Sequence, residues 1–257
     1  MGSVTVNGSK VNFEAGEGFE EGRRKGHTVL LIHGATDNHK IWRHQMEALS
    51  KDHSPVAVDL PGHLDSGGEG IDNAGGFRAF IKGLAEALDL APFVFAGHSM
   101  GGSMALDFAV HHGDMLKGAI MVGSSPSWEI SDEEISPWRE DPDKIRRESD
   151  EMYSRQTSED VKAWAAKEMS GTPGEVCYSD LSACGTFDAN PDFSQVTVPM
   201  LVVVGDEDVM SIPGSELVAE KVQGAQYDLI TACGHPIMIE HPDILNDLML
   251  KFLDGLD

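Results

Sequence analysis

The chain has 257 residues, of which 40% are hydrophobic and 24% charged, a composition that excludes a disordered or fibrous protein. This length allows one large α/β domain or two small domains. The 43 acidic residues outnumber the 19 Lys and Arg residues and give a formal net charge of −24. Because a surface of that sign repels phosphate groups, we expect neither nucleic acid nor an anionic membrane as a partner.

Cysteine usage and hydropathy further narrow the class of protein. The three cysteines, Cys177, Cys184 and Cys233, are too few for a disulfide framework, and an odd number cannot all pair within the chain. No apolar run approaches the roughly 20 residues of a membrane span. Residues 1–25 are polar and glycine-rich, unlike a signal peptide. We therefore expect a cytoplasmic protein, and since no spacing of His, Cys or acidic residues fits a metal site, we expect no metal or other cofactor.

Short apolar runs alternate with helical patterns along the first half of the chain. Two strand-like segments within residues 3–13 flank Asn7-Gly8, the dipeptide that favours a two-residue hairpin turn. The run Thr28-Val-Leu-Leu-Ile32 is apolar throughout, which predicts a strand buried on both faces. The following elements are, in order, a helix over 41–49, a strand over 55–58, a helix over 77–88, a strand over 92–96, a helix over 100–111 and a strand over 119–122.

The alternation stops at about residue 124 and resumes at about residue 200. Between them lies an acidic, helix-like stretch that contains Trp128, Trp138 and Trp164. The last elements are a strand over 200–204, a helix over 213–222, a strand over 226–230 and a helix over 244–253. Such alternation predicts an α/β fold with a mostly parallel central sheet flanked by helices. We expect residues 1–123 and 194–257 to form the core, and residues 124–193 to form a helical cap inserted into it.

The strongest motif is Gly-His-Ser-Met-Gly at residues 97–101, where a predicted strand meets a predicted helix. A G-x-S-x-G motif at that junction makes a tight turn that exposes the serine hydroxyl above the sheet. The glycines are needed because side chains at their positions would collide. We interpret Ser99 as a nucleophile, since a mere helix cap would not need this pattern.

A serine hydroxyl needs a base, and the base needs an acid that orients it. Asp206, Glu207 and Asp208 follow the apolar strand over 200–204, and His235 follows the next strand. Because both strands are parallel, these side chains are expected at the same edge of the sheet. His241 is the alternative base, but it precedes Pro242 at a helix start and is typical of a structural turn residue. The chain order is therefore Ser, Asp, His, as in α/β-hydrolases.

These features resemble α/β-hydrolase-fold serine hydrolases of the lidded esterase and lactonase type. The resemblance covers most of the chain outside residues 124–193 and includes Leu-Ile-His-Gly at 31–34, Asp-Leu-Pro-Gly-His at 59–63 and Gly-His at 234–235. It implies the α/β-hydrolase fold, with Ser99 as nucleophile, Asp208 as acid and His235 as base. Leu64 departs from the family pattern, which has a second glycine there, so this loop is expected to turn differently.

The oxyanion that forms during acyl transfer needs two backbone N–H donors. One is the amide of Met100, the residue after the nucleophile. The resemblance implies that the other is the amide of Ala35, directly after His-Gly. We also expect a set of residues around these groups to bind substrate, and we interpret His33 as a brace for its loop rather than as a catalytic group; the set is His33, Gly34, Trp42, His98, Trp128, Met210 and Met238.

The sequence therefore predicts a serine hydrolase that cleaves a small apolar carboxylic ester or lactone through an acyl-enzyme. One alternative is C–C bond hydrolysis of a diketone or dienoic acid by the same three residues. Similar C–C hydrolases often carry Asn where His98 stands. The other alternative is a ligand-binding pseudo-hydrolase or receptor that keeps the pocket. The expected partner is a small-molecule substrate, and the sequence leaves a homodimer open.

Overall fold

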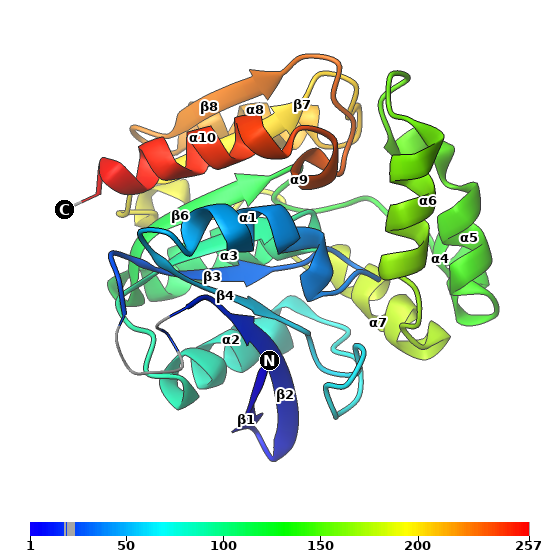
Figure 1. The fold of residues 1–257 in the computed structure, drawn as a ribbon, viewed down its shortest axis with the longest axis horizontal. Helices are drawn as coiled ribbons and strands as arrows, with labels where there is room; N and C mark the ends of the chain where they lie inside the picture. The colour runs from blue at the N-terminus through cyan, green and yellow to red at the C-terminus, as the bar shows by residue number, and fades with distance from the viewer. Residues whose placement is uncertain (18, 20–23, 257) are drawn as a thin grey trace.

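The structure is a computed structural model that describes residues 1–17, 19 and 24–256. In this part of the chain, eight strands form one sheet in the order β1-β2-β4-β3-β5-β6-β7-β8 (Figure 1). The strands are β1 (Gly2–Val6), β2 (Ser9–Ala15), β3 (Thr28–Ile32), β4 (Ser54–Val58), β5 (Phe93–His98), β6 (Leu116–Val122), β7 (Met200–Gly205) and β8 (Gln226–Ile230). Strands β3 to β8 run parallel to one another, and β1 and β2 form an antiparallel extension at one edge. This arrangement confirms the expected α/β fold class.

The hairpin predicted around Asn7-Gly8 joins β1 and β2. Val6 pairs with Ser9, so two residues make the turn. Asn7 and Gly8 have φ values of +50° and +85°. Positive φ at both central residues is the requirement of a type I′ turn, and Asn and Gly adopt it at little cost.

Helices cover both faces of the sheet because its central strands are apolar on both. In β3, Leu30 and Ile32 pack into one hydrophobic core, and Val29 and Leu31 pack into the other. The first core is completed by α2 (Ala74–Ala87), α3 (Met100–His112) and α8 (Ile212–Lys221). The second is completed by α1 (Arg43–Leu49) and α10 (Pro242–Asp254), which lie in front of the sheet in Figure 1.

Between β6 and β7 the chain forms only helices and loops, and this stretch is described without a gap. We call residues 124–193 the helical segment. Figure 1 shows its helices beyond the arrowheads of the parallel strands, which is where side chains that follow those strands emerge. Its elements are α4 (Asp132–Ile135), η3 (Ser136–Arg139), α5 (Pro142–Glu148), η4 (Asp150–Met152), α6 (Glu159–Glu168) and α7 (Gly174–Cys184), and η5 (Phe193–Gln195) starts at its end.

Further short elements lie in the loops of the core, outside this segment. They are η1 (His39–Trp42), η2 (Gly113–Met115) and α9 (Ile237–Glu240). None of the described helices is both long enough and apolar enough to cross a membrane. Cys177, Cys184 and Cys233 are buried and unpaired with one another.

Candidate active site

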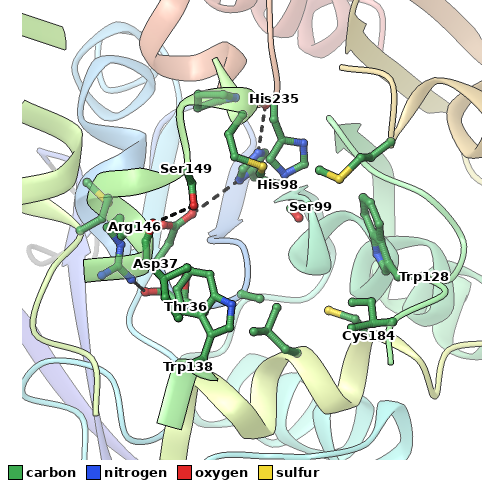
Figure 2. A pocket seen from close by; sticks show the side chains of 18 of the residues that line it. Thr36, Asp37, His98, Ser99, Trp128, Trp138, Arg146, Ser149, Cys184 and His235 are labelled. Atoms are coloured by element: carbon green, nitrogen blue, oxygen red, sulfur yellow. Dashed lines mark hydrogen bonds and ion pairs between the residues drawn. The ribbon is translucent and has the colours of Figure 1, made fainter. Parts of the chain in front are cut away.

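A cavity of about 700 Å³ lies at the carboxyl ends of the parallel strands, between the sheet and the helical segment. Six of the residues that the sequence analysis selected line it, namely Ala35, His98, Ser99, Trp128, Met210 and His235. Figure 2 labels His98, Ser99, Trp128 and His235 among them. The rest of its wall is mainly apolar and aromatic, and most of it comes from the helical segment. That part includes Ile130, Ile135, Trp138, Ile145, Met152, Tyr153, Ala165, Met169, Leu181 and Cys184.

Ser99 occupies the sharp turn between β5 and α3 that the motif predicts. Its φ of +52° and ψ of −119° are strained for a residue with a side chain. Close packing of backbone around it enforces this conformation. A Cβ atom on Gly97 would lie 1.9 Å from the carbonyl oxygen of Gly101, and one on Gly101 would lie 2.5 Å from the carbonyl oxygen of Ile32. The glycines are therefore required by contact, as expected for this turn.

His235 and Asp208 form a buried pair at the same edge of the sheet. Asp208 follows β7, His235 follows β8, and Nδ1 of His235 lies 2.8 Å from Oδ2 of Asp208. Because a carboxylate accepts, Nδ1 carries the proton, and the lone pair of the neutral ring is on Nε2. Figure 2 shows the Ser99 hydroxyl beneath the His235 ring on the same wall of the cavity. Asp208 also accepts a hydrogen bond from the Ser211 amide at 3.3 Å.

The pair shifts the pKa values of both partners. Burial lowers the pKa of His235, but the Asp208 charge and hydrogen bond outweigh it, so the pKa is raised above 6.5. Burial raises the pKa of Asp208, but His235 and the hydrogen bonds from Ser211 outweigh it, so the pKa is lowered from 3.8. The carboxylate therefore stays ionised, and the imidazole is a stronger base than an isolated one.

Asp206 and Glu207, the other two carboxylates after β7, point elsewhere. Asp206 accepts a hydrogen bond from the Cys233 amide at 3.2 Å, and Glu207 accepts one from the Arg155 amide at 3.0 Å. His241 bonds the carbonyl of Ala232 at 2.9 Å. Asp206 and His241 therefore hold loop backbone, Glu207 holds the helical segment, and none of the three lies in the cavity wall.

The loop after β3, residues 33–39, lies against Ser99. A Cβ on Gly34 would come within 3.1 Å of Ser99 Cβ, so this glycine permits the close approach. The His33 ring holds the loop through two hydrogen bonds. Its Nδ1 donates to the Gly34 carbonyl at 2.7 Å, and its Nε2 accepts from the Leu60 amide at 3.2 Å. Burial and the neighbouring His63 lower the pKa of His33 to about 4, so the ring is neutral.

The helical segment also holds this loop, through a buried ion pair. Oδ2 of Asp180, on α7, accepts from the Thr36 amide at 2.9 Å and lies 2.9 Å from Nε2 of His63. Nδ1 of His63 lies 3.2 Å from the carbonyl of Pro61, which can only accept. Burial lowers the pKa of His63, but Asp180 and the hydrogen bonds outweigh it and raise it. His63 is therefore held as an imidazolium.

Other predicted substrate contacts lie behind the cavity wall. Trp42 is fully buried among core side chains, and Met238 is equally buried. Like His33 and Gly34, Trp42 and Met238 are not among the described residues that line the cavity. We predicted contact with ligand because these residues are apolar and lie close in sequence to the site loops. Their side chains instead pack in the core, and the sequence pattern is the same for both roles.

Several residues that shape the site were not selected from the sequence. Asp37 and Arg146 line the cavity, and Glu240 bonds the amides of Gly234 and Ser154 at 2.5 and 2.7 Å. Asp180 could have been found, because it interrupts the buried face of α7 formed by Val176, Cys177, Ala183 and Cys184. A charged residue on an apolar helix face has to have a buried partner.

Leu64 replaces a glycine of the family pattern without changing the backbone that glycine would favour. Its φ is +45°, in the left-handed region, and the preceding Gly62 has a φ of +81°. Leu64 thus adopts a backbone conformation that glycine favours. The expectation that the loop turns differently because of Leu64 is wrong at this position.

Comparison with known proteins agrees with this architecture. A model described as the alpha/beta hydrolase family matches residues 29–248. The monoacylglycerol lipase ABHD6 of Bos taurus is 22% identical over 258 residues, covering 90% of this chain and 77% of that protein. The pimeloyl-[acyl-carrier protein] methyl ester esterase of Nitrosomonas europaea is 24% identical over 239 residues, covering 85% and 92%.

A solved structure shares the fold over nearly the whole chain. The enol-lactonase from Burkholderia xenovorans LB400 superposes with a TM-score of 0.85 and 22% identity, covering 99% of this chain and 100% of that one.

Replacing Gly97 with Ala should destabilise the protein by about 3 kcal/mol or more, because the new Cβ overlaps backbone that cannot move aside. Gly113→Ala is the matched control, since its Cβ would meet nothing nearer than Thr197 Oγ1 at 3.5 Å. Urea unfolding of both variants measures the difference. Equal midpoints for the two variants would contradict the argument from backbone contact.

Asp180→Asn should lower the free energy of unfolding by about 3 kcal/mol at pH 6, because it leaves a buried charge unpaired. His63 has a raised pKa in the folded state, so the stability that the pair contributes is present below 6.5 and is lost as pH rises through the raised value. The difference from the parent should therefore shrink at higher pH. Asp65→Asn, at an exposed position, is the control. A difference that grows with pH would refute the assignment.

Proposed function

The chain is a hydrolase of the alpha/beta hydrolase family, and from this premise we propose that it cleaves a small carboxylic ester or lactone through an acyl-enzyme on Ser99. The observation that carries the proposal is the buried pair of His235 and Asp208 opening into the same cavity as the strained Ser99. Relatives named as a methyl ester esterase, a monoacylglycerol lipase and an enol-lactonase support acyl chemistry of this kind.

In the first step, Ser99 Oγ attacks the carbonyl carbon while its proton passes to Nε2 of His235. The imidazolium that forms is stabilised by Asp208, whose carboxylate is 2.8 Å from Nδ1. Collapse of the tetrahedral intermediate breaks the bond to the alcohol oxygen, which takes the proton back from His235. Water, deprotonated by the same ring, then hydrolyses the acyl-enzyme and restores Ser99.

The negative oxygen of each intermediate would lie between the amides of Met100 and Ala35. Met100 N–H is at the first residue of α3, so the positive end of the helix dipole adds to its effect. Ala35 belongs to the loop that His33 and Asp180 fix in place. A rigid donor pair costs no reorganisation when charge develops, and one such donor contributes about 3 kcal/mol.

The helical segment would act as the cap of the active site, with residues 1–123 and 194–257 as the core domain. It supplies most of the apolar wall, and a cavity of about 700 Å³ is of the size that holds small organic molecules. Trp128 packs edge-on to His235, with ring centroids 6.2 Å apart. A cap in this place would exclude water from the acyl-enzyme and favour an apolar leaving group.

Ser99→Ala should lower kcat/KM for 4-nitrophenyl butyrate at least 10⁴-fold, because the variant lacks the hydroxyl group that forms the proposed acyl-enzyme. Ser194→Ala, at an exposed position outside the cavity wall, should match the parent. Full turnover by the Ser99→Ala variant would overturn the proposal. Labelling of Ser99 by a fluorophosphonate without turnover of any ester would favour a receptor, and turnover of a vinylogous diketone alone would favour C–C hydrolysis.

The pH dependence of kcat/KM should rise through a midpoint above 6.5, because His235 must be neutral to act as base and its pKa is raised. Asp208→Asn removes the charge that raises this pKa, so the midpoint should fall while kcat drops by about 10⁴-fold. A pH-stat assay with an ethyl ester between about pH 5 and 9 measures both. An unchanged midpoint in the variant would contradict the role of Asp208.

A further inference from the structure

Thr36 has a strained backbone one residue after Ala35, whose amide is the proposed oxyanion donor. The φ of Thr36 is +68°, in the left-handed region, where a β-branched residue is a rare outlier. The Asp37 amide donates to the Gly34 carbonyl at 3.3 Å, which closes a four-residue β-turn. Because φ is positive at Thr36 but not at Ala35, the turn is of type II. Gly or Asn usually takes the third position of such a turn, and here Thr36 takes it.

The helical segment bonds both polar groups of the Thr36 backbone. The N–H donates to Oδ2 of Asp180, on α7, at 2.9 Å, and the carbonyl accepts from Nη2 of Arg146, on α5. Figure 2 shows the Arg146 guanidinium against Thr36. The Asp180 side chain is 1% exposed and that of Arg146 is 8% exposed. Hydrogen bonds to charged groups are strong when they are shielded from water, so this pair offsets the strain at Thr36.

Both charged side chains are held by further partners. Nη1 of Arg146 donates to Oδ1 of Asp143 at 3.1 Å, within α5. Oδ2 of Asp180 lies 2.9 Å from Nε2 of His63, in a loop of the core. Each group is therefore oriented by contacts other than the one it makes with Thr36. Arg146 lines the cavity, but its guanidinium is bonded to the protein on two sides.

The strain matters because of the movement that would relieve it. A negative φ at Thr36 requires the peptide between Ala35 and Thr36 to turn over, since the ψ of the second residue and the φ of the third change together between type II and type I turns. The loop has little room for this beside the nucleophile, because a Cβ on Gly34 would come within 3.1 Å of Ser99 Cβ. A relaxed turn would thus redirect backbone dipoles next to the carbonyl that Ser99 attacks.

We propose that Arg146 and Asp180 are positioning residues, which hold the turn at Thr36 in its strained form and thereby aim the Ala35 amide at the oxyanion. This inference rests on the proposed ester hydrolysis at Ser99. Both residues act through the loop and not on the reacting atoms. The oxyanion hole is then complete only while the helical segment is seated on the core.

Arg146→Met should lower kcat for 4-nitrophenyl butyrate about tenfold or more and change KM less than about threefold. The reason is that an oxyanion forms in acylation and deacylation but not in substrate binding. Arg147→Met, at the exposed next position outside the cavity wall, is the matched control and should keep both constants. Arg146→Lys, which keeps a charged donor, should recover part of the lost kcat. An unchanged kcat in Arg146→Met would overturn the proposal.

A second substitution at Thr36 separates strain from the other effects of removing a charge. Glycine adopts positive φ without strain, so in a Thr36→Gly background Arg146→Met should lower kcat less than about threefold. Thr36→Ala is the matched control, because it also removes the hydroxyl and methyl groups but keeps the Cβ. Most of the loss should remain in that background. Equal losses in the two backgrounds would overturn the proposal, since an electrostatic effect of Arg146 on the site does not depend on the residue at position 36.

Amide hydrogen exchange over residues 34–37 measures the turn without catalysis. The Thr36 amide should exchange about tenfold faster in Arg146→Met than in the parent, and slowly again when Thr36→Gly is added through a retained bond to Asp180. Exchange that Arg146→Met leaves unchanged would contradict the proposal. If Arg146→Met does not fold, Arg146→Lys replaces it in the same comparisons, and equal kcat losses in the Gly and Ala backgrounds again overturn the proposal.

Failure of this inference and failure of the proposed function give different results. Ester turnover that disappears in Ser99→Ala but is indifferent to Arg146→Met would support the hydrolase and overturn the positioning role. A parent that turns over no ester would refute the proposed function. Hydrogen exchange would then still decide whether the helical segment holds the turn at Thr36.

Discussion

The site depends on a steric constraint in the backbone of the turn at Ser99. No carbon can be added at Gly97 without overlap of the Gly101 backbone, and β5 and α3 therefore approach each other more closely than side chains allow elsewhere. The strain at Ser99, in a region that costs on the order of 1–3 kcal/mol, persists because both flanking elements are deeply packed. Other parts of the site, including loop 33–39 and His235, are arranged around a serine whose position is already fixed.

Two carboxylates, one buried and one half-buried, connect the helical segment to the loops around Ser99. Asp180 reaches from α7 to the Thr36 amide and His63, and Glu240 reaches from α9 to the amides of Gly234 and Ser154. Each accepts more than one hydrogen bond from different parts of the chain. Carboxylates suit this task, because several donors can share two oxygens and a charge removed from water is tolerated only when it is well bonded. The segment and the core loops are thereby fixed relative to each other.

Periodicity and local motifs were sufficient to predict the sheet and the turn at Ser99. The apolar runs at 28–32 and 200–204 form β3 and β7. A short run that is apolar throughout is typical of a parallel strand buried on both faces of a sheet. Polar contacts between distant segments could not be predicted in this way. Thr36 and Asp180 are 144 positions apart, and nothing local indicates that they meet. Trp42 shows the opposite difficulty: an aromatic residue beside the loop suits a pocket or a core equally, and only packing decides.

The hydrogen bond from the His235 amide to the Met152 carbonyl, at 2.8 Å, has a consequence for how ligands enter and leave. Gly234 lies so close to residues 152–154 that a Cβ there would be 2.6 Å from the same carbonyl. Lifting this end of the helical segment would withdraw the backbone support of the imidazole. Ligands are therefore expected to enter and leave the cavity at another part of its rim. The imidazole would then keep its orientation between one reaction and the next.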